Sequence, residues 1–312
     1  MSPDWRPGAD LSLLRARAEL LARVRRFFAE RGVLEVETPL LCQAVVTDPN
    51  IEPLAQGQRF LQTSPEYAMK RMLAAGCGPI YQVCKAFRHG EAGSRHNPEF
   101  SLLEWYRPGF GLQQLMAEVR ELVELFLPGR TWRRISYRDL FRENLAVDPW
   151  LSTAAELEAC ARATLDLDFP AASRDQWLDL LLSHLLEPSL ADAGMIFVHD
   201  YPPSQAALAR LKQAGELVVS DRFELYADGL ELANAYRELT DADELAARFR
   251  RDNSELEGRG QAARPLDERL LSALQHGLPD CAGVALGLDR LLMLAQGCDS
   301  IDQVLAFSWS RA

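Results

Sequence analysis

The sequence predicts an α+β fold in which a mainly antiparallel β-sheet is flanked by helices. Two strand pairs indicate this fold. Residues 80–88 and 100–106 are β-prone runs joined by a loop that contains glycine and proline. Within residues 222–238, two more β-prone runs flank Asp228-Gly229, a dipeptide typical of the two-residue type I′ hairpin turn. Amphipathic helical patterns lie before, between and after these pairs, so helices are expected to cover the sheet.

The composition is that of an ordinary globular protein. The chain has 312 residues, of which 48% are apolar and 25% charged, which is enough to bury a sizeable core. No run approaches the roughly 18 apolar residues of a membrane span, and the N-terminus lacks the pattern of a signal peptide. Six scattered cysteines without a CxxC pair indicate reduced thiols in a cytoplasmic protein and argue against structural zinc. With no repeat or low-complexity linker, residues 1–312 are expected to form a single domain after a lead-in over 1–9.

Charge and motifs restrict how nucleic acid or ATP could bind. The formal net charge of −11 gives no global attraction to nucleic acid. Neither the P-loop pattern GxxxxGK[ST] nor the dinucleotide pattern GxGxxG occurs in the chain. Any ATP site must therefore be built in another way.

The remaining elements follow from helical and strand periodicity. A helix is expected from Asp10 to about Arg31, capped by Asp10 and stopped by Gly32. Its expected apolar stripe is Leu14, Ala18, Leu21, Val24 and Phe28. Further expected elements are a strand over 33–38 ended by Pro39, a helix entered within 61–72, mostly helical chain over 111–190 interrupted at Pro128-Gly129, Asp148-Pro149 and Phe169-Pro170, a strand over 195–201, helices over 241–258 and 265–276, and a strand leading into a helix over 283–294.

The first strand pair places reactive side chains on defined faces. Because side chains alternate along a strand, Gln82 and Arg88 share one face of the first strand. On the second strand Phe100, Glu104 and Tyr106 share one face. If the two faces coincide, an arginine that grips phosphate or carboxylate lies with a stacking ring and a carboxylate that can hold an ammonium. The alternative is a surface hairpin with a charged loop.

The second strand pair brings two carboxylates together. A two-residue turn puts Tyr226 opposite Glu231 and Glu224 opposite Ala233. Glu224 and Glu231 then project from one face about 7–8 Å apart, where they could hold Mg²⁺ once phosphate oxygens complete its shell. The alternative is a solvated face. Strict alternation places Asn234 on the face opposite Glu231, unless a bulge follows Glu231 or the chain turns helical there.

Two more segments end strands at helix starts. In residues 283–294 small side chains allow close approach of a ligand to the backbone, and Arg290 enters the first helical turn, where phosphate is also favoured. At Ser64-Pro65-Glu66 a serine can cap a helix, and Glu66 either complements the helix dipole or lines a pocket.

These segments together resemble the class II aminoacyl-tRNA synthetases. Phe87–Tyr106, FRHGEAGSRHNPEFSLLEWY, resembles motif 2 of that family, with RHNPEF and LE.Y similar to lysyl-tRNA synthetases. Residues 10–39 resemble motif 1, the dimer-forming element, and residues 283–294 resemble motif 3. ELAN…EL within 231–239 resembles the segment in which lysyl-tRNA synthetases bind metal. The motifs occur in the class II order and span nearly the whole chain, which implies a class II catalytic core and a homodimer formed through residues 10–39.

The resemblance implies a role for individual residues. Arg88 would hold the α-phosphate and the substrate carboxylate, and Arg290 the γ-phosphate of a bent ATP; both are the expected catalytic residues. Gly90 stands where the family has a glutamate, and Glu91 follows it. The other implied ATP-binding residues are Glu91, His96, Asn97 and Phe100. The implied amino-acid-binding residues are Glu66, Glu104, Tyr106, Asn234, Glu238 and Ala285, with Glu238 pairing with the ε-ammonium, and the implied Mg²⁺ ligands are Glu224 and Glu231.

The match is closer to a truncated paralogue than to a complete lysyl-tRNA synthetase. Only about ten residues precede the motif 1 helix, so no N-terminal anticodon-binding domain is expected. Ala285 and Ala235 stand where lysyl-tRNA synthetases have glycine. The strings TSPEYAMKR, AAGCGPIYQ, LEWYRP, PDCAGVALG and AFSWSRA resemble paralogues that use ATP and Mg²⁺ to activate (R)-β-lysine or lysine and transfer it to a lysine ε-amine of elongation factor P.

Two alternatives stay open from the sequence. One is a minimal lysyl-tRNA synthetase, although weak tRNA binding is expected from the acidic charge. The other is a non-catalytic binding paralogue, against which the combination of Arg88, Arg290 and two metal-type glutamates argues. Since β-lysine differs from lysine near its carboxylate, Ala285 is expected to set selectivity at that end of the substrate and not at its ε-ammonium.

Overall fold

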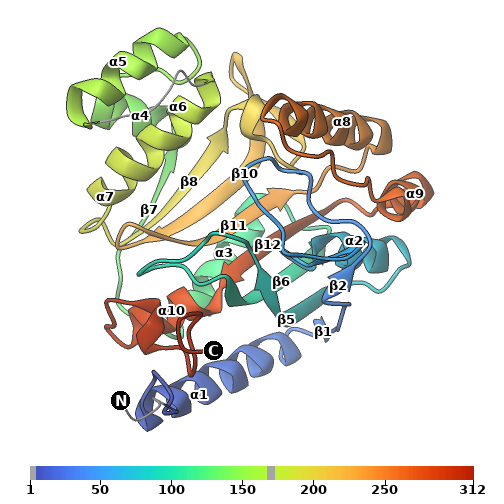
Figure 1. The fold of residues 1–312 in the computed structure, drawn as a ribbon, viewed down its shortest axis with the longest axis vertical. Helices are drawn as coiled ribbons and strands as arrows, with labels where there is room; N and C mark the ends of the chain where they lie inside the picture. Colours follow the sequence, from blue (N-terminus) through green and yellow to red (C-terminus); the bar gives the residue numbers. More distant parts are fainter. Residues whose placement is uncertain (1–4, 167–172) are drawn as a thin grey trace. The chain divides into compact units, whose positions relative to one another are not determined.

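A computed structural model describes residues 5–166 and 173–312 (Figure 1). Their contacts form two compact units, which are described separately. Unit one lies within Met1–Pro128 and Leu239–Ala312, and unit two is Gly129–Glu238. The expectation of a single domain stays a prediction. The interruption expected at Phe169-Pro170 and the first four residues of the lead-in lie outside the described residues.

Unit one is built on a sheet with strand order β1–β5–β6–β12. The pairs β5–β6 and β6–β12 are antiparallel, and the short β1 runs parallel to β5. The strands of this sheet are β1 (Leu34–Glu35), β5 (Ile80–Phe87), β6 (Glu99–Pro108) and β12 (Cys281–Gly287). A small second sheet, which the sequence did not predict, has the order β2–β4–β3: β2 (Leu41–Cys42), β3 (Ala55–Gln56) and β4 (Arg59–Leu61).

One face of the unit-one sheet is covered by two helices. Phe28 of α1 (Leu11–Ala29) stacks on Tyr81 of β5 and meets Trp105 of β6 edge-on. The Trp105 indole also donates to buried Glu118 of α3 (Leu112–Glu124) at 3.1 Å. Aromatic burial of this kind contributes roughly 0.5–1.5 kcal/mol per ring pair beyond the area it hides. The opposite face of the sheet is thereby left to carry the functional side chains.

The other helices of unit one follow the predicted segments closely. Asp10 caps α1 by accepting from the Leu13 amide, as predicted. The expected stripe is wrong at Ala18, which is exposed, because Leu20 and Phe27 turn inward instead. The predicted strand over 33–38 shrinks to β1. The remaining helices are α2 (Glu66–Ala74), α8 (Ala242–Gly258), α9 (Glu268–Gly277) and α10 (Leu288–Ala295).

Unit two combines helices with mainly antiparallel strands in the order β11–β10–β8–β7, with β9 paired to β10. Its core is rich in aromatic rings, with Tyr137 stacked on Phe141 and in contact with Tyr201. Its helices are α4 (Tyr137–Leu145), α5 (Ala154–Thr164), α6 (Arg174–Leu181) and α7 (Glu187–Ser189). Its strands are β7 (Trp132–Ser136), β8 (Met195–Tyr201), β9 (Leu211–Ala214), β10 (Leu217–Ala227) and β11 (Leu230–Arg237).

The α+β prediction is confirmed, and so is the mainly antiparallel pairing. The strand predicted over 195–201 matches β8, and the Asp228-Gly229 turn has positive φ at both residues, as a type I′ turn requires. β7 and β9 were missed: β7 lies in chain predicted to be helical, and β9 begins at the exposed Leu211. In the part of the chain that the structure describes, no helix combines the length and apolar character needed to cross a membrane.

Candidate active site

The face of the unit-one sheet that lies opposite α1 and α3 carries the predicted side chains. In the register, Gln82 lies opposite Glu104, and Glu104 lies opposite Ala285 of β12. Ala86 lies opposite Phe100 in the same way. Since directly paired residues of an antiparallel ladder share a face, this register confirms that the two predicted faces coincide.

Arg88 lies just beyond β5, where its amide donates to the Pro98 carbonyl at 2.9 Å. Its guanidinium carbon lies 5.1 Å from the centre of the Phe100 ring, and Nη1 lies 3.6 Å from the Glu91 carboxylate. Its buried Nε has no hydrogen-bond partner among the described residues. This half-buried guanidinium still has an N–H donor to offer, and an aromatic ring lies beside it. The pair suits a ligand in which an anionic group is attached to a nucleobase.

Arg290 lies in the first turn of α10 and contacts the loop between β5 and β6. Its Nη2 hydrogen-bonds Nε2 of His96 at 2.5 Å, and its Nε donates to the Arg95 carbonyl at 3.3 Å. Two arginines, Arg88 and Arg290, therefore border the loop in which the sequence predicts ATP binding. His96 must accept from Arg290, which requires a neutral imidazole.

The pKa of His96 is lowered by partial desolvation and by the nearby guanidinium of Arg290. The folded state therefore favours the neutral His96 imidazole, and the contribution of His96 to folding stability is complete above the unfolded pKa of 6.5. This contribution is lost as pH falls through the lower folded pKa. We expect the Arg290→Met variant to raise the pKa of His96, because a neighbouring cation is removed. Histidine NMR titration measures this, and circular dichroism melting shows whether the variant is folded. An unchanged His96 titration would contradict the contact.

The start of α10 is fixed by a buried ion pair that the sequence analysis missed. Arg17 of α1 pairs with Asp289 at 2.5 Å and also donates to the Val304 carbonyl at 2.9 Å. The second oxygen of Asp289 accepts from the Ser101 amide at 2.6 Å. Asp289 directly precedes Arg290, so this network fixes the backbone position from which the Arg290 side chain extends. The one sequence signal for this ion pair was the acidic Asp289 in an otherwise apolar helix start, next to Arg290.

Asn97 is held by the protein on both sides of its amide. Its Nδ2 donates to the Glu99 carbonyl at 2.5 Å, and its Oδ1 accepts from the Trp309 amide at 2.9 Å. Asn97 thus ties the loop to the C-terminal segment. A second N–H of Nδ2 and a second lone pair of Oδ1 stay available in addition to these two bonds, so the contact with ATP stays a prediction.

Glu104 and Tyr106 form the polar end of the sheet face. Both side chains are buried, and the Tyr106 hydroxyl donates to Glu104 at 2.7 Å. A buried carboxylate needs charge-assisted partners, and a substrate ammonium supplies one. The predicted shared face of these two residues is confirmed by this bond.

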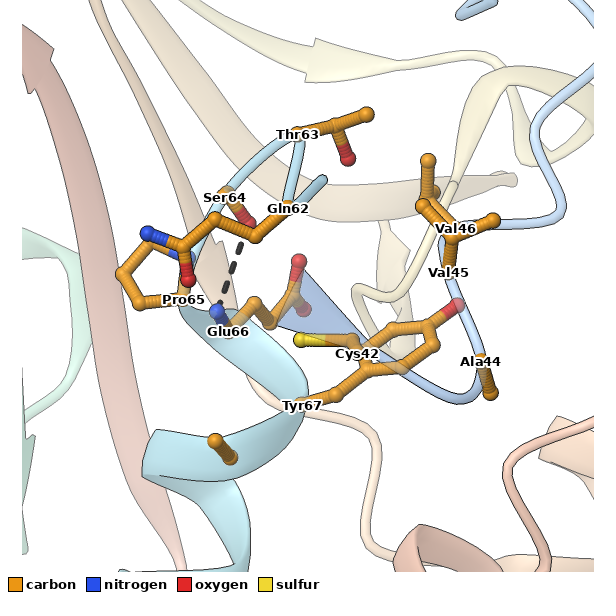
Figure 2. Close-up of a pocket in the computed structure, with 11 residues that line it drawn as sticks. Cys42, Ala44, Val45, Val46, Gln62, Thr63, Ser64, Pro65, Glu66 and Tyr67 are labelled. Atoms are coloured by element: carbon orange, nitrogen blue, oxygen red, sulfur yellow. Dashed lines mark hydrogen bonds between the residues drawn. The ribbon is translucent and has the colours of Figure 1, made fainter. Parts of the chain in front are cut away.

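Glu66 lines a small pocket of about 30 Å³ together with Cys42, Thr63 and Tyr67. Figure 2 shows its carboxylate pointing into this space from the start of α2. Lys70, one turn further along α2 and almost fully buried, holds one oxygen of Glu66 at 2.5 Å. The volume suits a water-sized group such as an ammonium.

In unit two, Glu224 is surrounded by donors. Tyr201 and Tyr226 donate to one of its oxygens at 2.5 and 2.6 Å. Arg222 and Asn234 donate to the other, the amide of Asn234 at 3.2 Å. Burial raises the pKa of Glu224, while the Arg222 guanidinium acts in the opposite direction.

The contact between Asn234 and Glu224 follows from a bulge in the hairpin. Tyr226 lies opposite Glu231 as predicted, but Glu224 lies opposite Asn234, so the predicted pairing of Glu224 with Ala233 is wrong. The register shifts by one residue between these pairs, because an extra residue follows Glu231. The predicted bulge is therefore confirmed, and the helical alternative is wrong.

The other predicted residues of unit two lie on β11 and at its end. The bulge brings Glu231 and Asn234 onto the face of Glu224. Oδ1 of Asn234 is buried and has no hydrogen-bond partner among the described residues. Glu238 follows β11 and is 1% exposed.

Comparison with known proteins identifies the family. The model of the tRNA synthetases class II (D, K and N) matches residues 4–311. The chain belongs to this family. Curated relatives from Salmonella paratyphi B, Salmonella schwarzengrund and Salmonella enteritidis PT4 are each 46% identical over 321 aligned residues, covering 99% of this chain and 98% of each relative. All three are named elongation factor P–(R)-beta-lysine ligase. The resemblance seen in the motifs is confirmed.

Protein donors surround the carboxylate of Glu224, one of the two predicted Mg²⁺ ligands, and the Mg²⁺ site of Glu224 and Glu231 stays a prediction. An ionised carboxylate offers about four acceptor positions, and four donors surround those of Glu224. Among the described residues, no group of three or more acidic, histidine or cysteine side chains is arranged to hold a metal. Glu224 acts here as the acceptor that orients Arg222 and Asn234.

Ala285 lies directly opposite Glu104, beside the predicted ammonium ligand and not remote from it. We therefore expect its methyl to narrow the space along the substrate's carbon chain. A methyl-sized change in a packed pocket typically discriminates by about 10–200-fold. Ala285→Gly should shift the kcat/KM ratio toward α-lysine, relative to β-lysine, by at least tenfold in adenylation kinetics.

Ala282→Gly is the matched control for this variant. Ala282 is buried on the same strand, but alternation places it on the covered face of the sheet. It should lose stability without changing the isomer ratio. Equal losses for both isomers in Ala285→Gly would show that this methyl only packs the sheet.

Proposed function

We propose that this chain is an ATP-dependent ligase that activates (R)-β-lysine or lysine as an aminoacyl-adenylate and transfers it to a lysine ε-amine of elongation factor P. The 46% identity to ligases of that name, which extends over 99% of this chain, supports this activity. One sheet face supports it most directly, since it combines Arg88 and Phe100 with the buried pair Glu104 and Tyr106. Such a face has places for a nucleotide phosphate, a base and an ammonium.

In the first step the substrate carboxylate attacks the α-phosphorus of ATP and pyrophosphate leaves. The carboxylate is already ionised, so no protein nucleophile is needed, and catalysis consists of positioning and charge stabilisation. Arg88 would neutralise charge at the α-phosphate and Arg290 at the γ-phosphate. ATP use is expected for this family. Requirement for Mg²⁺ stays a prediction, and the steps proposed here depend on the two arginines.

In the second step the acceptor amine attacks the adenylate carbonyl. A C–N bond forms, the C–O bond to AMP breaks, and the amine loses a proton, which gives an amide and AMP. Substrate groups also supply the nucleophile of this step. The protein must hold the adenylate away from water until the acceptor arrives, because hydrolysis would compete.

Two further parts of the proposal concern the assembly and its location. Leu11 and Leu34, in the motif 1 region, are 62% and 55% exposed, as expected for side chains that meet a second copy. We propose a homodimer through residues 10–39, which sedimentation velocity would report as twice 35.0 kDa. All six cysteines are free thiols, which suits the reducing cytoplasm.

The activation step is tested by isotope exchange between pyrophosphate and ATP. Exchange should depend on an added amino acid, and amino acids that lack a side-chain ammonium should support it only weakly, with a higher KM than a lysine isomer. Exchange with none of the lysine isomers would contradict the proposed function. Activation of lysine followed by efficient charging of tRNA would instead identify a minimal lysyl-tRNA synthetase.

A further inference from the structure

Gln82 is a buried polar side chain with hydrogen-bonding capacity that the protein leaves unused. It is 3% exposed, and its Oε1 has no hydrogen-bond partner among the described residues. Burying an amide oxygen without a partner costs free energy, and most such groups in folded proteins are satisfied. An unsatisfied amide on a functional face suggests a ligand that completes it.

Gln62 provides the contrast within the same unit. It is also 3% exposed, yet its Nε2 donates to the Lys85 carbonyl at 2.8 Å. Gln62 therefore has a structural role that its surroundings explain. Gln82 has the same chemistry and burial without such an explanation.

The position of Gln82 indicates which ligand it would meet. It lies directly opposite Glu104, and Glu104 lies opposite Ala285, so the three form one row across β5, β6 and β12. Cβ atoms of directly paired residues are about 4.5–5.5 Å apart. The amide of Gln82 and the carboxylate of Glu104 therefore project from neighbouring positions on the same face.

An amide beside a carboxylate suits an ammonium ion. An alkylammonium has three N–H donors, and one oxygen of Glu104 already accepts from Tyr106. A second carboxylate at position 82 would repel Glu104 and favour its protonation. A neutral carbonyl oxygen supplies another acceptor without a second negative charge.

We propose that Gln82 is a substrate-binding residue that accepts a hydrogen bond from the side-chain ammonium of the amino acid. This inference rests on the proposed function, since it takes the lysine-type substrate as given. Gln82 is thus a further amino-acid-binding residue, one that selects for an ammonium at the far end of the substrate. The selection acts together with Glu104, to which Gln82 is paired in the sheet.

Gln82→Leu tests this role, because leucine is similar in size and cannot accept a hydrogen bond. In the exchange assay, the KM for lysine or β-lysine should rise by about ten- to a hundredfold, as expected for a lost bond to a charged group. The KM for the matching analogue without the ammonium, norleucine or 3-aminohexanoate, should change less than threefold. The melting temperature should stay equal or rise, because an unsatisfied amide is replaced by an apolar side chain.

Gln62→Leu is the matched control. It should lower the melting temperature, since the Lys85 carbonyl loses its donor, and should leave the ratio of the two KM values unchanged. A ratio that stays constant in Gln82→Leu would overturn the role of Gln82 while leaving the ligase activity standing. Failure of the unmodified protein to activate any lysine isomer would overturn both.

Discussion

Replacement of Arg88 by alanine should abolish formation of the aminoacyl-adenylate. The guanidinium of Arg88 lies over Phe100 and beside Glu91, where it would meet both the α-phosphate and the attacking carboxylate. Losing one preorganised donor at a developing charge typically costs about 10²–10³-fold in rate, and Arg88 would supply more than one. Lysine-dependent exchange of pyrophosphate into ATP is therefore expected to fall by at least that factor.

Arg134→Ala is the control for this variant, because Arg134 is an exposed arginine on β7 of unit two. Its exchange rate should match that of the unmodified protein. Circular dichroism melting separates loss of chemistry from loss of fold. Undiminished exchange in a folded Arg88→Ala protein would remove Arg88 from the catalytic site.

Glu238→Gln should weaken binding of every lysine isomer while leaving ATP binding nearly unchanged. Glu238 is almost fully buried, and a charge-assisted bond between its carboxylate and an ammonium is worth roughly 1.5–3 kcal/mol. The corresponding rise in KM is about tenfold or more. Glutamine keeps the shape of the side chain and removes its charge, so the variant tests the charge itself.

The KM for each lysine isomer, measured at saturating ATP, reports this effect. The KM for ATP, measured at saturating lysine, shows whether the substitution leaves ATP binding unchanged. Glu216→Gln, an exposed position in the turn between β9 and β10, controls for the substitution. An unaltered KM for lysine would place Glu238 outside the amino-acid pocket.

Much of the framework could be predicted because local chemistry determines it. Asp228-Gly229 admits positive φ at both turn positions, and a short apolar run such as 195–201 predicts a buried strand without tertiary information. Alternation alone placed Phe100 and Glu104 on one face of their strand, while the register of the structure showed that Gln82 shares this face. Motif order then assigned these segments to one family.

The rest depends on tertiary contacts that periodicity does not encode. The amide of Asn97 contacts the Glu99 carbonyl and the Trp309 amide, and Trp309 lies about two hundred residues away in the sequence. The carboxylate of Glu224 accepts from Tyr201 and Arg222. The pair Arg17–Asp289 joins the two ends of the chain, which no local pattern reveals. The buried amide of Gln82 became informative only once its surroundings were known.

The acceptor of the activated amino acid tests the central claim most directly. Purified protein, ATP and each lysine isomer would be incubated with elongation factor P and, separately, with lysine tRNA. Intact-mass spectrometry should show elongation factor P heavier by one lysyl or β-lysyl group, about 128 Da, as an amide keeps all but one water of the amino acid. With a net charge of −11, the protein should charge tRNA poorly at physiological salt. Charged tRNA together with unmodified elongation factor P would contradict the account.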